Sequence, residues 1–436
     1  MANQVTQLAL VTSAIAARLE NTLVASKLVQ WKKGSTPISP LNGFQYVENV
    51  APRYVRRRWT GEVSDISAGK QDTVFGSEIF KLNQGDTLDF FYGDFENIQD
   101  FDAAKKSERI RSIGEDAGHR IDAEILQTAA LCGHNWVGTP GAQVDSVEAL
   151  IEGYARLKEE GVSDGDIFAV LPFTDMAPLA QYLMELPAPD ALATGVVTSL
   201  SFKTLVGLPV LFTQQLPVLT TGSRTVTAAV DGASQNVNYR DVAASTTTNG
   251  YFMTQELDLK SLGANATIAD GEIFTIAGVN AYDNRKQASK GRLQQFRVIG
   301  SYTANGSGVA ANVRISPAII IPNTATSIGD NGVNTAHATC TAAPTDSAVV
   351  TFMGAASTDF LQRALIKKSA VRIETADLES LPSGENAKVS LKSIPLTMRS
   401  YKYANGDTGA TSFRADLPWQ ANVNPFGRFE VVRING

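Results

Sequence analysis

The most regular pattern of apolar and polar positions in this chain runs from Asp100 to Gly133 and predicts one long helix. Apolar residues recur in it at steps of three and four, and charged residues fall between them. The apolar stripe comprises Ile110, Ile113, Ala117, Ile121, Ile125 and Thr128. Asp100 or Asp102 is placed to cap the first turn, and Gly133 to close the last in a left-handed conformation. At about 1.5 Å per residue, such a helix is roughly 45 Å long.

Two glycines, Gly114 and Gly118, interrupt this helix. A glycine in a helix interior costs about 1 kcal/mol relative to alanine, so both need an explanation. Another backbone could pack closely against that face, or the helix could bend there. We favour close packing and keep the bend as the alternative.

The chain ahead of the long helix predicts an arm followed by a hairpin. Thr6 to Leu28 is amphipathic, which favours an N-terminal helical arm. Phe44 to Val50 has the composition of a strand. The segment from Arg53 to Lys81 predicts two strands joined by a glycine-containing turn, and we interpret it as a long, highly charged hairpin. Because an isolated hairpin is at best marginally stable, we expect it to lie on another surface, such as a second subunit.

The chain that follows the long helix predicts a mixed α/β unit. A helix over Val144 to Glu160 precedes a buried strand over Asp166 to Leu171. A second helix begins after Pro172 and runs to about Leu186, and Leu205 to Thr213 is again strand-like. Helices and strands that alternate in this way favour one layered α/β unit.

From Gly222 onward the pattern changes to short alternating strands separated by turns rich in Gly, Asn and Thr. The clearest strands are Glu272 to Ala277, Gln295 to Ile299 and Asn312 to Ser316. We interpret this stretch as an all-β insert that forms a small barrel or sandwich. A helical pattern returns over Phe352 to Ile366. Closing strands follow at Ala370 to Glu374, Ala387 to Leu391, Leu396 to Tyr403 and Arg428 to Ile434.

The composition indicates a folded, multi-unit protein. A chain of 436 residues with 43% hydrophobic residues predicts two or three packed units. Its start has neither the basic cluster of a signal peptide nor a long apolar run, so we expect a protein that folds in a cytosol and has no membrane segment. Cys132 and Cys340 match no metal spacing and are expected to be free thiols.

The sequence carries no signature of enzyme chemistry. It has no phosphate loop, no nucleophile elbow and no histidine pair at helical spacing. Asp122 and Glu124 are close in sequence, but they point in different directions on a helix, so we interpret them as solvated charge. We therefore predict a protein that is not an enzyme and that uses no cofactor and no metal.

The net charge of -6 is ordinary, but its distribution along the chain is not. Before Trp59 only Glu20 and Glu48 oppose a larger set of basic residues. These are Arg18, Lys27, Lys32, Lys33, Arg53, Arg56, Arg57 and Arg58. The balance then reverses through a run of acids. The run comprises Glu62, Asp65, Asp72, Glu78, Asp86, Asp89, Asp94, Glu96, Asp100 and Asp102. A basic segment followed by an acidic run suits head-to-tail contacts, in which the basic segment of one copy meets the acidic run of the next.

The most concentrated part of the basic segment allows two interpretations. It comprises Arg53, Arg56, Arg57, Arg58 and Trp59, with Tyr54 among them. Arginines bind phosphates and aromatic rings stack on bases, so the segment could serve a nucleic-acid-binding protein. The cluster is short, however, and acidic chain follows it at once. We therefore favour contacts between subunits and keep nucleic-acid binding as the alternative function.

The order of these parts resembles the bacteriophage major capsid proteins of the Hong Kong 97 type. Among them the chain is most similar to the coat proteins of short-tailed Salmonella-type phages, which carry an inserted β-barrel. Leu216 to Thr220 resembles the run that leads into that insert, and Gly271 to Val279 resembles a strand within it. Arg414 to Trp419, followed by Val423, Asn424 and Pro425, resembles the family's ending.

The resemblance implies an α+β fold with a fixed order of parts. These are an N-terminal helical arm over 1–45, an extended hairpin loop over 46–92, a spine helix and peripheral domain over 93–140 with parts of 370–436, the first part of an axial α/β domain over 141–221, an all-β insertion domain over 222–347, and axial and peripheral return strands over 348–436.

The resemblance also implies that the chain is a major capsid protein of the virion. Copies of it would assemble in the host cytoplasm, as hexamers and pentamers, into an icosahedral shell around double-stranded DNA. A portal protein and a separate scaffolding protein are the further partners implied, since the segment before the arm is too short to be a built-in scaffold. Within the shell we expect Arg56, Arg57 and Arg58 to meet acids of a neighbouring copy. The candidates are Asp94, Glu96, Asp100 and Asp102.

Overall fold

The computed structural model divides the chain into two compact units. It describes residues 2–34, 44–55, 72–91, 108–185, 204–205, 207–225, 228–246, 251–322, 332–379, 385–404 and 411–436. Unit 1 comprises Met1–Tyr46, Phe80–Ala129 and Lys368–Asn424. Unit 2 comprises Val47–Ile79, Ala130–Lys367 and Pro425–Gly436.

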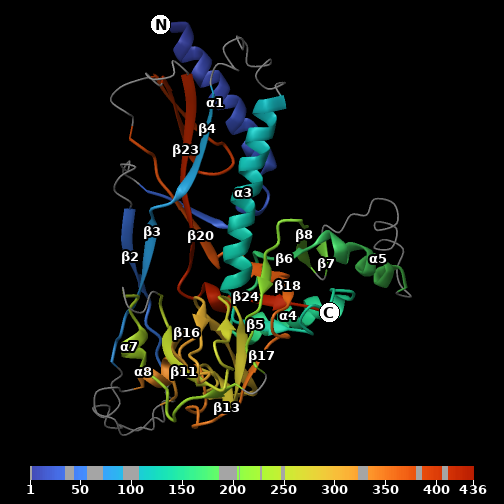
Figure 1. The fold of residues 1–436 in the computed structure, drawn as a ribbon, viewed down its shortest axis with the longest axis vertical. Coiled ribbons are helices and arrows are strands. Elements are labelled where there is room, and N and C mark those ends of the chain that lie inside the picture. Colours follow the sequence, from blue (N-terminus) through green and yellow to red (C-terminus); the bar gives the residue numbers. More distant parts are fainter. Residues whose placement is uncertain are drawn as a thin grey trace, which may run out of the picture. The chain divides into compact units, whose positions relative to one another are not determined.

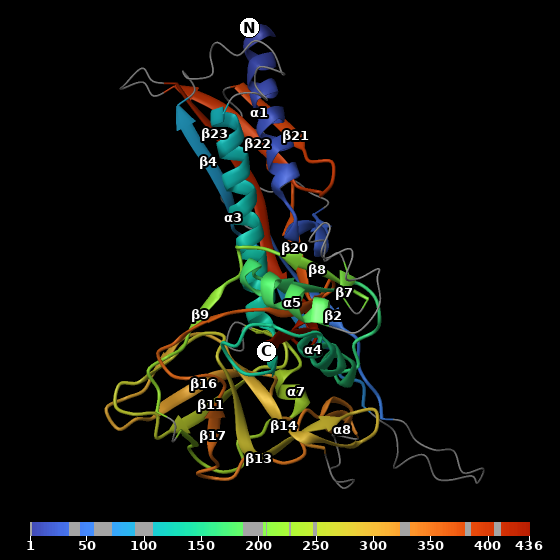
Figure 2. The same ribbon diagram turned by 90° about the vertical axis from the view of Figure 1, so that its right-hand side faces the viewer.

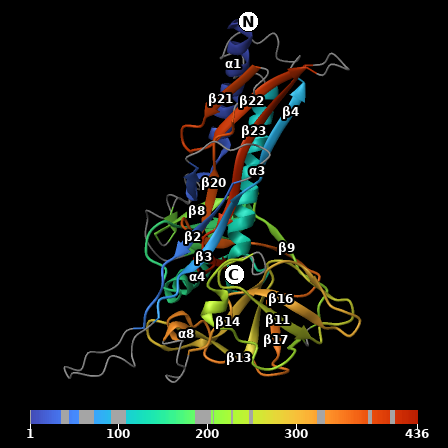
Figure 3. The ribbon, with the colours of Figure 1, turned by 90° about the vertical axis from the view of Figure 1, so that its left-hand side faces the viewer.

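Unit 1 is built on a six-stranded sheet whose central strand is β23 (Figure 3). Its strands in spatial order are β1 (Gln30–Lys33), β20 (Val371–Thr375), β23 (Thr411–Val423), β22 (Thr397–Ala404) and β21 (Glu385–Ser390), and β4 (Gly85–Phe91) also pairs with β23. The closing strands predicted near β20, β21 and β22 are confirmed. The sequence pattern did not predict β23, because Pro418 interrupts it and proline is rare in central strands.

Two helices lie side by side in unit 1, α1 (Ala2–Thr22) and α3 (Glu108–Cys132; Figures 1 and 2). A long helix at α3 is confirmed in the described part of the chain, and its predicted beginning at Asp100 lies outside that part. α1 packs on β21 and β22, where the hydroxyl oxygens of Thr12 and Ser400 lie 2.6 Å apart. The prediction of one helix from Thr6 to Leu28 is wrong at its end. The chain leaves helical geometry after Thr22 and then forms the short 3-10 helix η1 (Ala25–Leu28).

The glycines of α3 lie where α1 approaches closest. A Cβ added at Gly114 would lie 2.7 Å from the Cβ of Arg18 and 3.1 Å from the carbonyl oxygen of Ile15. One added at Gly118 would lie 2.8 Å from the Cβ of Thr22. Real Cβ atoms do not come this close, so the two helices can touch only because these positions lack side chains. Close packing therefore accounts for both glycines, and a bend at them stays a proposal.

Unit 2 contains a mixed sheet that the helices α4 (Val147–Glu159) and α5 (Met176–Glu185) accompany. Its strands in spatial order are β5 (Asn135–Val137), β24 (Val431–Ile434), β19 (Ala364–Lys367), β6 (Ile167–Leu171), β8 (Leu208–Phe212) and β7 (Thr204–Leu205). The predicted helix before Gly161 and the predicted strand at β6 are confirmed, and so is a helix after Pro172, which starts as the 3-10 turn η4 (Phe173–Asp175). The single strand predicted over Leu205 to Thr213 is two strands that turn at Gly207.

The helix predicted over Phe352 to Ile366 is wrong, because this stretch forms strands. They are the end of β17 (Val350–Phe352), β18 (Asp359–Leu361), which pairs with β9 (Val218–Thr220), and β19. Gly354 and Ser357 have positive φ angles of 85° and 50°, which break a helix. β19 then lies between β6 and β24, where its backbone groups bond to both neighbours. Long-range pairing thus overrides the local helical period.

A second six-stranded sheet of unit 2 closes on itself (Figure 2). Its strands in order are β10 (Ala229–Val230), β11 (Gln255–Lys260), β16 (Ala310–Ser316), β14 (Ala288–Val298), β13 (Ile273–Asp283) and β17. The amide of Val230 donates to the carbonyl of Ala348 at 3.0 Å, and that of Val350 to Ala228 at 2.8 Å. These bonds join the first and last strands, so the sheet forms a barrel around an apolar core that includes Leu257 and Phe296. The smaller elements here are β12 (Thr267–Ile268), β15 (Tyr302–Thr303), α7 (Tyr239–Val242) and α8 (Val333–His337).

Strands β2 (Phe44–Val50) and β3 (Gly76–Leu82) form a two-stranded sheet. The strand predicted over Phe44 to Val50 is confirmed. Residues 56–71, which include the predicted turn of the hairpin, lie outside the described residues.

A buried arginine ends α3. Arg433 is fully buried and donates to the carbonyl oxygens of Ala130 at 3.1 Å and Leu131 at 2.8 Å. It thereby satisfies carbonyls that have no partner inside the helix. The left-handed conformation predicted for Gly133 is wrong, because this glycine is not among those with positive φ. Position 133 requires a glycine because a Cβ there would lie 2.8 Å from the carbonyl oxygen of Val431.

Buried charges hold the backbone of Phe252 in unit 2. Glu78 accepts a hydrogen bond from the Phe252 amide at 2.7 Å, and Arg428 donates to the Phe252 carbonyl at 2.9 Å. Burial raises the pKa of Glu78 to about 7, although Arg428 and the Phe252 amide act to lower it. The folded protein therefore binds a proton at Glu78 more tightly than the unfolded chain does.

We predict that replacing Gly114 with alanine lowers the free energy of unfolding by up to about 2 kcal/mol. Overpacking against α1 costs about 1–3 kcal/mol, and the better helix propensity of alanine returns about 1 kcal/mol. The measurement is urea unfolding followed by circular dichroism. Gly306→Ala is the control, since a Cβ there meets no atom within 4 Å and should leave stability unchanged or slightly higher. A more stable Gly114→Ala variant would contradict the close packing.

We predict that the free energy of unfolding of the wild type, relative to that of the Glu78→Gln variant, decreases as pH rises from about 4.5 to about 7. Over this range the unfolded chain loses the Glu78 proton while the folded state keeps it, so ionisation favours unfolding. Glutamine still accepts the Phe252 amide but does not titrate. Urea titrations of both proteins at several pH values give the difference in unfolding free energy. A difference that stays constant or grows with pH would contradict the raised pKa.

Candidate functional site

The turn that follows α1 is held by a single carboxylate of α3. Asp122 accepts the backbone amides of Val24 at 2.7 Å, Ala25 at 3.0 Å and Ser26 at 3.0 Å. Asp122 is buried, with only 3% of its surface exposed. The interpretation of Asp122 as solvated charge is therefore wrong. A carboxylate that binds three amides fixes the direction in which the chain leaves α1.

This turn delivers β1 to the edge of the unit 1 sheet. β1 runs parallel to β20, with Gln30 opposite Arg372 and Trp31 opposite Ile373. The indole nitrogen of Trp31 donates to the carbonyl of Ser26 at 2.6 Å, which ties the strand back to η1. Among the described strands β1 has β20 as its only neighbour, so β1 is an edge strand of the described sheet.

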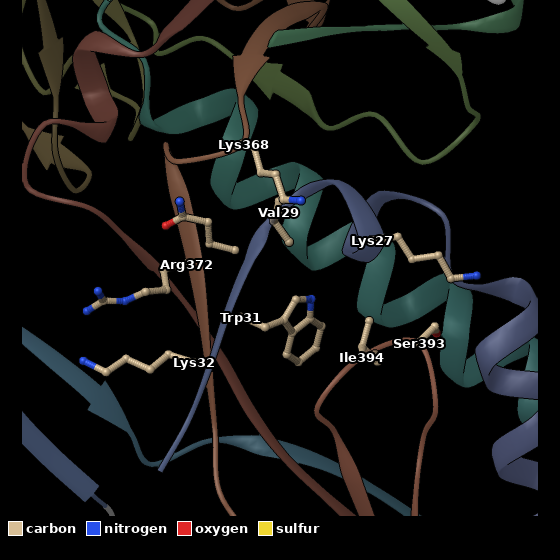
Figure 4. Close-up of a pocket in the computed structure, with 9 residues that line it drawn as sticks. Lys27, Val29, Trp31, Lys32, Lys368, Arg372, Ser393 and Ile394 are labelled. Carbon is tan, nitrogen blue, oxygen red and sulfur yellow. The ribbon is translucent and has the colours of Figure 1, made fainter. Parts of the chain in front are cut away.

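A groove of about 480 Å³ lies beside β1 (Figure 4). Its lining comprises Lys27, Val29, Gln30, Trp31, Lys32, Lys368, Arg372, Ser393 and Ile394. All four charged side chains in this lining are basic. Figure 4 shows Lys32 and Arg372 on one side of the Trp31 ring, and Ser393 and Ile394 on the other. We call this site the β1 groove.

Several contacts hold the basic residues of the β1 groove in place. Lys27 donates to the carbonyl of Glu20 at 2.9 Å, and Lys32 lies 4.3 Å from the centre of the Tyr46 ring. Arg372 donates to Glu374 at 2.7 Å and to the Tyr46 hydroxyl at 2.8 Å. Glu374 is an acidic partner of Arg372, and the carboxylate of Glu20 interacts electrostatically with Lys27.

The floor of the groove is fixed by Glu20. The amide of Ser393 donates to the Glu20 carboxylate at 2.5 Å. Burial acts to raise the pKa of Glu20, but hydrogen bonds from Ser393 and Lys392 and the charge of Lys27 bring it below its usual value. Glu20 is thus ionised at neutral pH and holds the 392–394 segment against the end of α1.

A larger cleft in unit 2, of about 1170 Å³, has a different electrostatic character. Its charges are of both signs, and several of them are paired. Glu160 lies 2.9 Å from Lys290 and 2.6 Å from Arg292, and Lys367 lies 3.3 Å from Glu430. Burial acts to raise the pKa of Glu160, but the neighbouring bases hold it low. Its lining therefore carries charges of both signs, whereas the charged side chains that line the β1 groove are all basic.

Neither cysteine is placed for chemistry. Cys132 and Cys340 are free and buried, which confirms that they are unpaired thiols. Burial raises the pKa of Cys132 to about 11 and that of Cys340 to about 12, so neither forms a thiolate at neutral pH. Within the described ranges, no three His, Cys, Asp or Glu side chains gather as metal ligands would. In that same part of the chain, no helix combines the length and apolarity needed to cross a membrane.

Most of the site residues predicted from sequence lie outside the described residues. They are Arg56, Arg57, Arg58, Trp59, Asp94, Glu96, Asp100 and Asp102. Arg53 is described and belongs to the unit 2 cleft. Its amide donates to Nε2 of His337 at 3.3 Å, and its guanidinium lies 4.4 Å from the centre of the Phe426 ring.

The β1 groove is not predicted by the sequence pattern. Lys27 and Lys32 belong to the basic N-terminal segment, and nothing local connects them with Lys368 and Arg372. The available signal was weak. A lysine pair at Lys32 and Lys33 next to a tryptophan is typical of an edge strand, but the other half of the groove comes from a distant part of the chain.

Comparison with known families now identifies the chain. The family model described as P22 coat protein, gene protein 5, matches residues 59–425. The chain belongs to the P22 coat protein family. This coat protein is therefore a major capsid protein, and its function is to form the shell of a phage. No curated protein gave a match to the sequence.

Solved structures similar to this coat protein come from phages. Mycobacterium phage Che8 is 11% identical, with 94% of this chain and 90% of that chain covered and a TM-score of 0.40. The mature capsid of bacteriophage PhiM1 is 8% identical, with 94% and 86% covered and a TM-score of 0.38. The CUS-3 coat protein I-domain is 23% identical, with 29% and 96% covered and a TM-score of 0.20. All three TM-scores are below 0.5, so the family assignment rests on the sequence match.

We predict that Asp122→Asn destabilises this coat protein by about 2–4 kcal/mol. Asparagine presents an amide group to backbone donors that now bind a carboxylate, so at least one buried donor loses its partner. Urea unfolding measures the loss, and hydrogen exchange at Val24, Ala25 and Ser26 should become faster. Asp116→Asn makes the same chemical change at an exposed position of α3 and is the control. Unchanged exchange at these three amides would contradict the role of Asp122.

Proposed function

We propose that this coat protein builds an icosahedral shell of hexamers and pentamers around a double-stranded DNA genome. A separate scaffolding protein guides the assembly, and a portal protein occupies one position in the shell. The observation that carries the proposal is the family match over residues 59–425. The uneven charge of the chain supports it, because a basic N-terminal segment and a following acidic run suit contacts between copies.

We also propose the Hong Kong 97-like division of the chain. In this division the sheet and paired helices of unit 1 serve as the peripheral domain, with α3 as its spine. The α/β sheet of unit 2 serves as the axial domain, and the closed barrel is its insertion. The position of the barrel supports this division, because β10 to β17 lie in the chain between β8 and β19 of the mixed sheet.

The contacts that hold neighbouring copies together involve the loop over 46–92. We propose that Arg56, Arg57 and Arg58 of one copy, with Arg53 and Trp59 beside them, meet acids of the next copy. The acids are Asp94, Glu96, Asp100 and Asp102. Each contact is modest, and a shell gains its stability from the number of such contacts.

The decisive experiment is electron microscopy of the particles formed when the coat protein is expressed with a scaffolding protein. Closed shells, or tubes and spirals of the same subunit, are expected. Sedimentation velocity measures the fraction of subunits that remain unassembled. A small species under all conditions, with DNA binding that falls steeply with salt, would contradict the proposal and favour the nucleic-acid-binding alternative.

We predict that Arg57→Glu reduces the yield of closed shells at least tenfold and leaves the subunit folded. The reversed charge repels the acids of the neighbouring copy. Shell yield is measured by sedimentation and folding by circular dichroism. Lys388→Glu, a charge reversal at an exposed position of β21, is the control and should assemble normally. Normal shells from Arg57→Glu would contradict the proposed contact.

A further inference from the structure

The turn between β15 and β16 contains an asparagine followed by a glycine, Asn305 and Gly306, and both residues are exposed. The side-chain amide of an asparagine can react with the backbone nitrogen of the next residue. Glycine obstructs this attack least, because it has no Cβ. Within the described residues the same pair occurs once more, as Asn435 and Gly436. The surroundings of the two pairs differ.

The side-chain oxygen of Asn305 lies between two backbone donors. Its Oδ1 accepts the amide of Ser307 at 2.9 Å and the amide of Val309 at 3.0 Å. Both partners are donors, so the atom between them is the carbonyl oxygen and not the amide nitrogen. Negative charge develops on this oxygen when a nucleophile adds to Cγ, and N–H groups that already bind the oxygen stabilise that charge. The turn therefore has the donor arrangement that speeds acyl transfer.

The nucleophile and the leaving group are less restrained than this oxygen. Among the described protein groups, neither the backbone nitrogen of Gly306 nor Nδ2 of Asn305 has a hydrogen-bond partner. A Cβ added at Gly306 would meet no atom within 4 Å. The peptide that must attack Cγ thus has room to move, and no bond has to break before the side-chain nitrogen departs.

The rest of the turn is held by the barrel. The amide of Asn305 donates to the carbonyl of Val309 at 2.8 Å. The carbonyl of Asn305 accepts the amide of Gly308 at 2.9 Å and that of Asn265 at 3.2 Å. A Cβ at Gly308 would lie 3.0 Å from the backbone nitrogen of Gly263, so the turn is also packed against a neighbouring loop. These contacts keep the two donors beside Oδ1, which an unfolded chain cannot do.

Asn435 is held in the opposite way. It is buried, and its Oδ1 accepts the indole N–H of Trp136 at 2.7 Å. Its Nδ2 donates to the carbonyl of Ala142 at 2.9 Å. The side-chain nitrogen could leave only if this buried bond were broken. The folded structure therefore protects Asn435 from the reaction that it permits at Asn305.

We propose that Asn305 is a site of spontaneous deamidation, which the folded turn accelerates. The backbone nitrogen of Gly306 attacks Cγ of Asn305 and loses its proton, and Nδ2 leaves as ammonia, which closes a succinimide ring. Water then opens the ring at either of its two carbonyl groups and gives aspartate or isoaspartate. Water is the only co-reactant. The reaction is independent of the proposed assembly of copies.

The product adds negative charge to a part of the chain that has little charge. Between Thr303 and Val350 the only Asp, Glu, Lys or Arg residues are Arg314, Asp330 and Asp346. An aspartate at position 305 still accepts the amides of Ser307 and Val309 through its carboxylate, so this product keeps the turn. Isoaspartate instead lengthens the main chain by a methylene group and changes the turn.

Peptide mapping by mass spectrometry tests the reaction. The purified coat protein is kept at mildly alkaline pH, either folded or unfolded in urea, and the loss of ammonia at each asparagine is followed over time. Asn305 should react at least about threefold faster in the folded protein than in the unfolded chain. Asn435 is the internal control and should react only in the unfolded chain. A folded Asn305 that reacts no faster than the unfolded one would overturn the proposal.

Three variants separate the donor arrangement from other causes. Ser307→Pro removes one N–H donor to Oδ1, whereas Ser307→Ala keeps that donor and removes only the hydroxyl. The proline variant should react about tenfold more slowly than the alanine variant when folded, and the two should react alike in urea. Gly306→Ala obstructs the attack and should slow it in folded and unfolded chains alike.

Circular dichroism checks that each variant is folded. Equal rates for folded Ser307→Pro and Ser307→Ala would overturn the role of the two donors. A reaction that is lost in Ser307→Ala would assign the acceleration to the hydroxyl and would also overturn it. If Ser307→Pro fails to fold, the comparison of folded and unfolded wild type decides.

Discussion

The structure of unit 1 depends on the carboxylate of Asp122. Three consecutive amides that follow α1 and open η1 have no helical partner, and burial would leave them without water. One ionised side chain on α3 satisfies all three. It thereby ends α1, starts η1 and directs β1 to the edge of the sheet. Without this interaction the chain would have no reason to leave the helix where it does, since the apolar pattern continues to Leu28.

The same pair of helices shows how backbone contact and charge work together. Gly114 and Gly118 bring α3 against α1, and Asp122 lies one turn further along the same face. The close approach places the carboxylate within reach of the turn. The buried Arg433 binds the carbonyls of Ala130 and Leu131 at the C-terminal end of α3. Two buried charges thus act on the C-terminal half of the long helix, one on its contact with the turn after α1 and one on its last turn.

For a shell protein, the fold matters for the surfaces it leaves open. The barrel of unit 2 closes on itself, which removes its edges, and several charges of the unit 2 cleft pair with one another. The β1 groove in unit 1 is different, because its charged lining residues are all basic and, among the described strands, only β20 pairs with β1.

The sequence by itself determined the elements whose signal is local. The spacing of apolar residues predicts α3, α4 and β6, because helix and strand geometry sets that spacing. The free cysteines and the uneven charge can likewise be read from the sequence alone. Tertiary structure decided the rest. Residues 352–366 have a helical period but become strands because β6 and β24 bond their backbone, and β23 forms despite Pro418. The β1 groove exists only because the register of β1 on β20 places Lys32 beside Arg372, and no local pattern encodes which distant strand will be the neighbour.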